Sequence, residues 1–510
     1  MPSMLDYQLT AVCLVTAVYF LTLSVFTGST RKLRHIPTAG FTMPILFLFS
    51  SVRYFLDARS VIEESIAKWP TSIFKIPYLL EWLVIIHQPS HIEDLRKMPE
   101  HILSSLKAFE YVFQLAYTLG HHINENPYHV PIIRTQLTRS LPLLVPEIHD
   151  ELVQAFKHYI PLTDDWSEIK ALDTAMKIIS RTSNRAFVGA PLCRNPEWIE
   201  VNVQYTLDVI KVASIPRFFP AFMRPYLNKL ISQVGKRTEK ALELLRPVLK
   251  GRRTEREQKG ENHPDKPLDI LSWIMDEAKG EEAEEWYLTS RVLAINAGAI
   301  HTTSMGFTQA LYDLAARQEY VQPLREEVEK VIAREGWTKA ALDQMPQVDS
   351  FLKESQRLRP MGLNLMGRIA MQDYTFSDGT TIPAGTMIAV YVVDDHTSEE
   401  FYENPLEFDG FRFVKKRQNA VSSGQTEKRF DLVTTGLDSL GFGHGRHACP
   451  GRYFASSELK LILAHIVMNY DVRTVEEGVR PEDLHIIDNC IPNPTAKLLF
   501  RRRQNYLRSH

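Results

Sequence analysis

The stretch GFGHGRHACPG, residues Gly441 to Gly451, decides the expected fold because it encloses one cysteine, Cys449, in glycines and basic side chains. Glycines let a backbone turn tightly and pass close to a flat object, since they have no Cβ atom to clash with it. Pro450 is well suited to begin a helix, which would place the sulfur at a helix N-terminus. There, N–H groups and the helix dipole favour thiolate, and Arg446 and His447 add positive potential. The loop is therefore predicted to present an anionic sulfur beside a glycine-lined platform, as an axial iron ligand requires.

Two other interpretations of Cys449 follow from the residues alone. A lone cysteine is more commonly a buried structural residue than a ligand, and the glycine spacing by itself leaves that possibility open. A nucleophile, as in cysteine hydrolases, needs a histidine that is held by an amide or a carboxylate. His444 and His447 are near in sequence, but on so tight a loop they cannot both serve the sulfur and bind a carboxylate.

The stretch as a whole resembles the haem-binding signature of the cytochrome P450 monooxygenases. The matching residues are Phe442, Gly443, Gly445, Cys449 and Gly451. His447 stands where most members have arginine, and either side chain can donate a hydrogen bond to a haem propionate. The resemblance implies haem b, iron protoporphyrin, as the cofactor and Cys449 as its metal ligand.

Upstream of the cysteine loop, three residues resemble the buried salt-bridge network of the same family. Glu354 and Arg357 match its ExxR helix, and residues three apart share a helix face, so the carboxylate and guanidinium can pair. Taken alone, such a pair would more often be a solvated surface bridge worth little. Arg412 matches the third member of the network, and together with the cysteine loop it favours the buried interpretation.

A predicted helix from Leu268 to Arg317 contains glycine and hydroxyl residues near its middle, where they are locally unfavourable. This part, around Gly298, resembles the oxygen-activation helix of the family. The resemblance implies that Thr302 holds a water and relays protons to dioxygen at the iron. The alternative is that its hydroxyl only bonds to a helix carbonyl. His301 stands at the position of the family's acid and would either join the relay or only shape the groove.

Haem propionates need cations, and the resemblance implies three candidates. His447 is one, and Arg368, just before a β-like run, is similar to another. Arg134 matches the arginine of the family's WxxxR helix, although the tryptophan is missing here. Its alternative is an ordinary surface arginine.

The N-terminal residues are predicted to form a membrane anchor. Leu9 to Phe26 contains no charged residue and reaches the roughly 18-residue lower limit for a span. Arg31, Lys32 and Arg34 follow it, which keeps the bulk of a chain on the cytoplasmic side. A cleaved signal peptide is the competing interpretation, but its basic residues would precede the apolar run. The expected parts are an anchor at 1–30, a basic and proline-containing hinge at 31–45 and a haem-thiolate catalytic domain at 46–510.

The expected fold class is mainly α with small β-sheets, the cytochrome P450 fold, preceded by a single transmembrane helix. Apolar spacings of three and four between residues 131 and 245 predict a series of helices. Runs with strand character lie at 73–78, 81–87 and within 374–393. The polar stretch 251–267 is predicted to be an exposed loop.

Composition excludes several classes of protein. With 44% hydrophobic and 24% charged residues, the 510-residue chain can form a large core. A net charge of −2 gives no reason to expect a nucleic-acid partner. The four cysteines are too scattered for a disulfide framework or a zinc site. No dinucleotide fingerprint accompanies a strand, so electrons are expected from an NADPH-cytochrome reductase that docks on a basic face near the cysteine loop.

The substrate is expected to be a hydrophobic small molecule, because the segments 103–119 and 362–366 that would line the pocket are largely apolar. Residues 215–225 are rich in aromatics, proline and arginine, and they predict either a lip that dips into membrane lipid or an ordinary buried loop. The segments 301–304 and 126–129 resemble the fungal ent-kaurene oxidase-like group. That resemblance implies a terpenoid-type intermediate of fungal secondary metabolism.

The function that these features predict is an NADPH-reductase-dependent monooxygenase that hydroxylates or further oxidises this substrate. It would be a single-pass protein of the endoplasmic reticulum membrane with its catalytic domain on the cytoplasmic side. The alternative is a haem-thiolate isomerase or dehydratase that does not use the oxygenase cycle. A haem sensor or carrier and a cysteine hydrolase are more distant alternatives.

Overall fold

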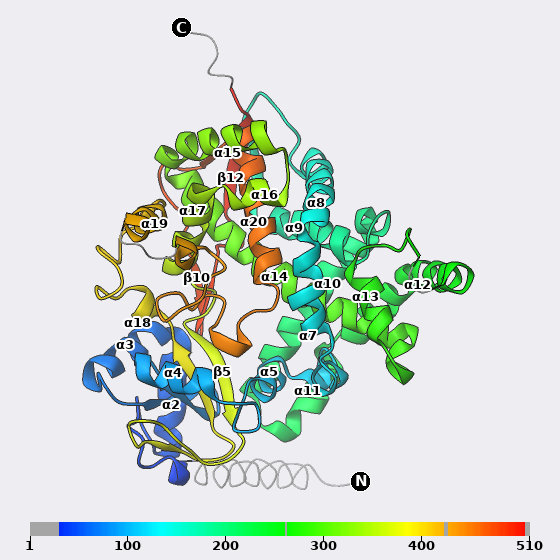
Figure 1. The fold of residues 1–510 in the computed structure, drawn as a ribbon. Coiled ribbons are helices and arrows are strands. Elements are labelled where there is room, and N and C mark those ends of the chain that lie inside the picture. The colour runs from blue at the N-terminus through cyan, green and yellow to red at the C-terminus, as the bar shows by residue number, and fades with distance from the viewer. Residues whose placement is uncertain (1–29, 261–262, 423–426, 505–510) are drawn as a thin grey trace, which may run out of the picture.

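The computed structural model describes residues 30–260, 263–422 and 427–504, and Figure 1 shows their fold. Most of these residues lie in helices, and the strands form small sheets. The expected fold class, mainly α with small β-sheets, is therefore confirmed. The predicted transmembrane anchor, 1–30, lies outside the described ranges except for its last residue. Within those ranges, no helix is long and apolar enough to cross a membrane.

A five-stranded sheet organises the N-terminal side of the molecule, at the lower left of Figure 1. Its strand order is β1-β2-β8-β5-β3, in which β1 and β2 form an antiparallel hairpin and β2 pairs in parallel with β8. The strands are β1 (Phe74–Tyr78), β2 (Glu81–Ile86), β3 (Leu103–Ser104), β5 (Asn364–Ala370) and β8 (Met387–Tyr391). The strands expected at 73–78 and 81–87 are thus present.

Alternation along β2 explains how helices cover both faces of this sheet. Val84 packs in the same buried cluster as Ile92 of helix α4, whereas its neighbour Leu83 packs with Ile62 of helix α3. Successive side chains of a strand point to opposite faces, so an almost continuous apolar run is stable only when both faces are covered. The helices of this region are α2 (Pro44–Leu56), α3 (Ala58–Lys68), α4 (Pro89–Lys97), α5 (Ser105–Phe113) and α18 (Val393–His396).

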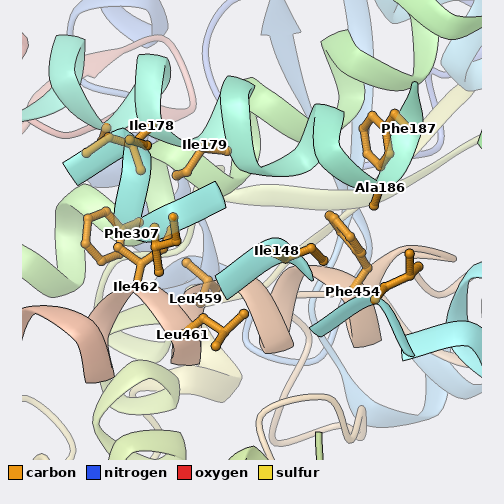
Figure 2. Close-up of a cluster of buried hydrophobic side chains, with 14 of the residues drawn as sticks. Ile148, Ile178, Ile179, Ala186, Phe187, Phe307, Phe454, Leu459, Leu461 and Ile462 are labelled. Atoms are coloured by element: carbon orange, nitrogen blue, oxygen red, sulfur yellow. The ribbon is translucent and has the colours of Figure 1, made fainter. Parts of the chain in front are cut away.

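The rest of the molecule is a helical body built around α14 (Glu285–Ala316), which packs against α9, α10, α12 and α17. Figure 2 shows part of its core, where Ile178 and Phe187 of α9 meet Phe454 and Ile462 of α20 and Phe307 of α14. The long helices are α8 (Thr138–Tyr159), α9 (Ala171–Phe187), α10 (Pro196–Ser214), α12 (Val234–Lys259), α15 (Val321–Glu335), α17 (Pro346–Leu358), α19 (Arg412–Ser422) and α20 (Arg452–Asn469).

Short elements join this frame. The short α-helices are α6 (His122–Glu125), α7 (His129–Pro131), α11 (Arg224–Ile231), α13 (Ile270–Glu277) and α16 (Lys339–Asp343). The 3-10 turns are η1 (Leu115–Tyr117), η3 (Leu192–Arg194), η4 (Ile215–Phe218), η5 (Ala221–Met223), η6 (Gly280–Ala283), η7 (Gln318–Tyr320), η8 (Glu427–Phe430) and η9 (Gly445–His447), and η2 (Ile132–Leu137) is a π-helix. The remaining strands form the sheets β4-β12-β9 (Ser167–Lys170, Lys497–Arg502, Tyr470–Thr474), β10-β11 (Leu484–Ile486, Asn489–Ile491) and β6-β7 (Tyr374–Thr375, Thr381–Ile382).

The exposed loop predicted at 251–267 is wrong for its first part, because helix α12 continues to Lys259. Arg252 donates to Asp269 at 2.7 Å, and Arg256 pairs with Asp276 on α13. These ion pairs with a later segment hold a polar, charged run in helical form. Gly260, with φ of +85°, then ends the helix.

Candidate functional site

Cys449 lies between the turn η9 and the first residue of α20, so the structure places its sulfur at a helix N-terminus. The loop closes on itself through the Cys449 N–H, which donates to the Phe442 carbonyl at 2.8 Å. Gly443 and Gly445 have φ of +68° and +74°, a region that strains other residues. At Gly445 a Cβ atom would also lie 2.3 Å from Cγ of Arg96 on α4. Gly445 is thus required where the loop passes over α4.

Among the described cysteines, Cys449 differs in its surroundings from Cys193 and Cys490. Those two are buried, and burial raises the pKa of each thiol to about 12. Burial also raises the pKa of the Cys449 thiol, but hydrogen bonds from the N–H groups of Gly451 and Arg452 and the Arg452 guanidinium counteract it. The protein alone therefore does not favour the thiolate, contrary to the expectation from sequence. A bound cation is needed to ionise this sulfur fully.

Arg368 is the most telling cation near the loop. A β-bulge in β5 shifts the register between Leu365 and Arg368, and the guanidinium donates to the carbonyls of Met366 and Gly367 at 3.2 and 2.8 Å. Its side chain is buried, with 3% exposed, its Nε has no hydrogen-bond partner, and no carboxylate of the described residues lies within ion-pairing distance of it. Burial lowers its pKa to about 10. A buried guanidinium without an anion is costly, so this position fits an acidic group from outside the chain.

His447 lies beside Arg368 and shows the same deficit. Its Nδ1 is 3.1 Å from Ser105 Oγ and 3.3 Å from a carboxylate oxygen of Glu100, while its Nε2 is buried without a partner. Burial and the nearby Arg368 lower its pKa. Sequence reasoning missed Glu100 and Ser105, because no local pattern links them to a residue so far along the chain.

Arg134 reaches the loop from the π-helix η2. It is exposed, and its Nη2 donates to the Arg446 carbonyl at 3.3 Å. It is also close enough to His447 to lower the pKa of that imidazole. The structure therefore brings Arg134, Arg368 and His447, the three propionate candidates, to one side of the cysteine loop.

The middle of α14 is open on one face. Although most of this helix is buried, Gly298 and Thr302 are exposed, and they are four residues apart on the same face. A Cβ atom on Gly298 would meet nothing within 4 Å. The Thr302 hydroxyl donates to the Gly298 carbonyl at 2.8 Å, which is the back-bonding geometry. Its oxygen can still accept a hydrogen bond from a water.

His301 is half-buried one residue earlier on α14. Burial lowers the pKa of its imidazole to about 4, so the ring is neutral near pH 7. A neutral imidazole offers one donor and one acceptor.

These features fit a haem. Cys449 supplies a sulfur, Arg368 supplies a buried N–H group that lacks an acceptor, His447 supplies a buried ring nitrogen without a partner, and the Gly298–Thr302 face supplies open space. Phe442 of the loop packs against the same buried cluster as Ala297 and Ala299 of α14, which puts the loop and this face on one core. In Figure 1 the helices α14 and α20 run side by side through the middle of the molecule.

Glu354, Arg357 and Arg412 are brought together below the loop. Both oxygens of Glu354 accept from Arg357, through Nε and Nη2 at 2.8 Å each, and Nε of Arg412 donates to the same carboxylate at 3.0 Å. All three side chains are buried. The remaining donors of the two arginines bind backbone carbonyls between residues 396 and 407. The network thus ties α17 to the segment before α19.

The segments expected to meet substrate and membrane lie next to each other. Tyr111, in the predicted lining 103–119, faces Arg217, in the predicted lip 215–225. In the lip, Pro216 and Arg217 are buried, whereas Phe218, Phe219 and Phe222 are exposed. The lip is therefore not an ordinary buried loop, since its aromatic side chains face outward.

Comparison with known proteins gives a consistent result. The family model of cytochrome P450 matches residues 135–500. Cytochrome P450 monooxygenase 151 of Postia placenta is 40% identical over 476 residues, 92% of this chain and 94% of that protein. Ent-kaurene oxidase P450-4 of Gibberella fujikuroi is 35% identical over 461 residues, 89% of each chain. The structure of retinoic acid bound cyanobacterial CYP120A1 is similar in fold, with a TM-score of 0.69, 16% identity and coverage of 92% of this chain and 99% of that one.

Proposed function

Because this chain belongs to the cytochrome P450 family and is a haem-thiolate monooxygenase, we propose that it oxidises a hydrophobic, terpenoid-type small molecule with electrons from an NADPH-cytochrome reductase. The family implies a haem iron, a redox partner and a small-molecule substrate. The proposal specifies these three: haem b as the cofactor, an NADPH-cytochrome reductase as the redox partner and a terpenoid-type molecule as the substrate. The observation that carries it is that Thr302 is exposed near the middle of α14, a helix whose residues are mostly buried.

We propose that the cofactor is haem b and that Cys449 holds its iron. When bound, the haem supplies the redox chemistry that activates dioxygen. The N–H groups of Gly451 and Arg452 stabilise negative charge on the sulfur. Arg368, His447 and Arg134 hold the propionates.

Thr302 and His301 are proposed to manage protons and water. The Thr302 hydroxyl donates to the Gly298 carbonyl, so its oxygen is free to accept from a water and to keep that water on the open face of α14. His301 is neutral near pH 7, since burial lowers its pKa to about 4. Its imidazole can therefore accept a proton at one ring nitrogen and release a proton from the other. Proton delivery of this kind contributes about 10²–10⁴-fold to a rate.

The substrate class rests on the apolar lining and on one relative. Leu115 and Leu119 are buried in the main core cluster, and Phe109 and Phe113 pack against it. One relative is named as an ent-kaurene oxidase, and we extend that name to a terpenoid-type substrate of fungal secondary metabolism. Purified holoenzyme is incubated with reductase, NADPH and an extract of fungal terpenoid metabolites. Mass spectrometry should then detect a product that is one oxygen atom heavier than a compound of the extract.

The same assay separates the monooxygenase from a haem-thiolate isomerase or dehydratase. An oxygenase needs NADPH and reductase for every turnover, whereas an isomerase acts on a peroxide without either. Product that forms equally well without NADPH would contradict the proposal.

We propose that the reductase docks beside the cysteine loop. Lys97 of α4 and Arg446 of η9 are both exposed, and α4 packs against η9. A basic surface here attracts an acidic partner and speeds its association at low salt. Lys97→Glu with Arg446→Glu should raise the reductase concentration needed for half-maximal turnover, whereas Lys250→Glu, on the exposed side of α12, should not.

We propose that the protein lies on the endoplasmic reticulum membrane, with the 1–30 anchor in the bilayer. Two exposed apolar groups support this placement: Phe41, Met43, Leu48, Phe49, Val52 and Leu56 in or before α2, and Phe218, Phe219, Phe222, Tyr226 and Leu230 in the lip and α11. The Phe55 and Phe218 rings are 5.6 Å apart and join the two groups. The test uses protein that lacks residues 1–29, so that only the folded part can bind lipid. Replacing Phe49 and Phe222 by serine should reduce the fraction of this protein that floats with phospholipid vesicles.

A further inference from the structure

Arg217 in the turn η4 is a buried cation for which the described chain provides no anion. Its side chain is 6% exposed, and no carboxylate of the described residues lies within 4 Å of it. Its Nε and Nη2 are buried and have no hydrogen-bond acceptor. An arginine stays charged when buried, and burying an unpaired charge is strongly unfavourable.

Two tyrosines surround the guanidinium without neutralising it. The Arg217 guanidinium carbon is 5.1 Å from the ring centre of Tyr78 on β1 and 4.9 Å from that of Tyr111 on α5. The Tyr111 hydroxyl donates to Glu81 at 2.7 Å. Cation–π contacts recover only part of the lost hydration. They leave the Nε and Nη2 edge of Arg217 unused.

The unused edge has the geometry that binds a carboxylate. Nε–H and Nη2–H of an arginine point the same way and match the two oxygens of one carboxylate. Arg357 uses these two nitrogens to bind Glu354, at 2.8 Å each. At Arg217 the same pair of donors has no counterpart among the described residues.

Arg217 contacts a segment that is expected to line the substrate pocket. Tyr111 belongs to the segment expected to line the pocket, and so does Asn364, which donates to Asp488 at 3.2 Å. Asp488 interacts electrostatically with Arg217, but it forms no ion pair with it and is already bound by Asn364. We propose that Arg217 binds a carboxylate at one end of the hydrophobic substrate and so orients the apolar part toward Thr302. This inference rests on the proposed function, which it narrows to amphipathic acids.

Equilibrium binding to the holoenzyme tests the inference without turnover. The probes are dodecanoic acid and abietic acid, each compared with its methyl ester, and binding is followed by the shift of the haem Soret band in detergent without reductase. At least one acid should bind about ten- to a hundred-fold more tightly than its ester, as expected for a charge-assisted bidentate contact. If neither acid is preferred, or neither binds, the inference is overturned.

Two variants assign the preference to Arg217. Arg217→Gln should bring acid and ester to equal affinity, and Arg217→Lys should keep a smaller preference because it retains the charge and loses the fork. The matched control is Arg224→Gln on the same lip, since Arg224 already has Glu81 at 3.7 Å and should leave the preference unchanged. An undiminished preference for the acid in Arg217→Gln would overturn the assignment.

A lipid phosphate is the competing anion, because the lip also carries the exposed aromatic residues. Binding to phosphatidylglycerol vesicles is therefore measured for the wild type and for Arg217→Gln. Loss of vesicle binding in the variant with an unchanged acid preference would overturn the proposal in favour of a headgroup site. Failure of the proposed function is distinguishable from all of these results, because it appears as absence of NADPH-dependent product and not as a change in binding.

Discussion

Glu354→Gln tests whether the network below the cysteine loop stabilises the fold as its geometry implies. The carboxylate is fully buried, with 0% exposed, and it accepts four hydrogen bonds: two from Arg357, one from Arg412 and one from the Asp409 N–H. Glutamine keeps the shape but loses the charge, and its NH₂ group must face at least one guanidinium. Arg357 and Arg412 would then lack the one carboxylate that pairs with them among the described residues.

The expected loss follows from that arrangement. Removing one partner of a buried ion pair costs about 3–5 kcal/mol, because the remaining charge stays buried and uncompensated. At about 1.4 kcal/mol for each factor of ten, the ratio of folded to unfolded protein should fall by about 100- to 4,000-fold. Since folded proteins are stable by only about 5–15 kcal/mol, the variant should also yield much less holoenzyme.

Urea unfolding followed by tryptophan fluorescence measures the loss, with Glu64→Gln as the matched control. Glu64 binds Arg53 through both oxygens at 2.6 and 2.7 Å, so the contact is similar, but its side chain is 59% exposed. An exposed pair contributes at most about 1 kcal/mol. If Glu354→Gln cost no more than this control, burial would not be what gives the network its strength, and the reasoning would fail.

Three further predictions concern the sulfur of Cys449, the hydroxyl of Thr302 and the buried carboxyl group of Glu458. Cys449→Ser should abolish the red-displaced Soret band of the reduced carbon monoxide complex, whereas Cys193→Ser, which replaces a buried thiol with a pKa near 12, should keep it. Thr302→Ala should still consume NADPH but form product at least about a hundredfold more slowly, as expected when proton transfer worth about 10²–10⁴-fold is lost, and Thr302→Ser should restore coupling. Glu458 has a pKa raised to about 7 by burial, despite hydrogen bonds from Thr182 and Ser183. Between about pH 4.5 and 7 the folded state binds this proton and the unfolded state does not, so the free energy of unfolding falls as the pH rises through that window. Glu458→Gln removes this loss. In urea unfolding, the variant should therefore gain about 2–3 kcal/mol more over the wild type at pH 8 than at pH 5.

The features that could be predicted from sequence are those whose partners lie within a few residues. Glu354 and Arg357 share a helix face at a separation of three, so their pairing needs only helix α17 to form. The turns at Gly443 and Gly445 depend on the glycines themselves. Such local patterns predict the cysteine loop and the pairing of Glu354 with Arg357 from the sequence alone.

The failures occur where a distant segment decides the outcome. Residues 251–259 are polar enough to be a loop, yet Arg252 and Arg256 bind acids on and before α13, and these contacts keep the run helical. Similarly, nothing near Glu100 in the sequence connects it with His447, because the contact exists only after α5 and η9 are packed together. Local propensity is too weak to compete with such tertiary interactions.

Buried arginines show what the structure adds to the sequence, which marks Arg357, Arg412 and Arg368 as candidates but not Arg217. Arg357 and Arg412 share one carboxylate of this chain, so their charge is balanced internally and their role is structural. Arg368 and Arg217 are equally buried, but their Nε atoms have no acceptor and no carboxylate of the described residues pairs with them. Because every guanidinium carries the same charge when it is buried, we infer that the missing anion comes from a bound molecule and not from the described residues. A haem propionate would meet this requirement at Arg368, and the same reasoning leads to the proposal that Arg217 binds an acidic end of the substrate.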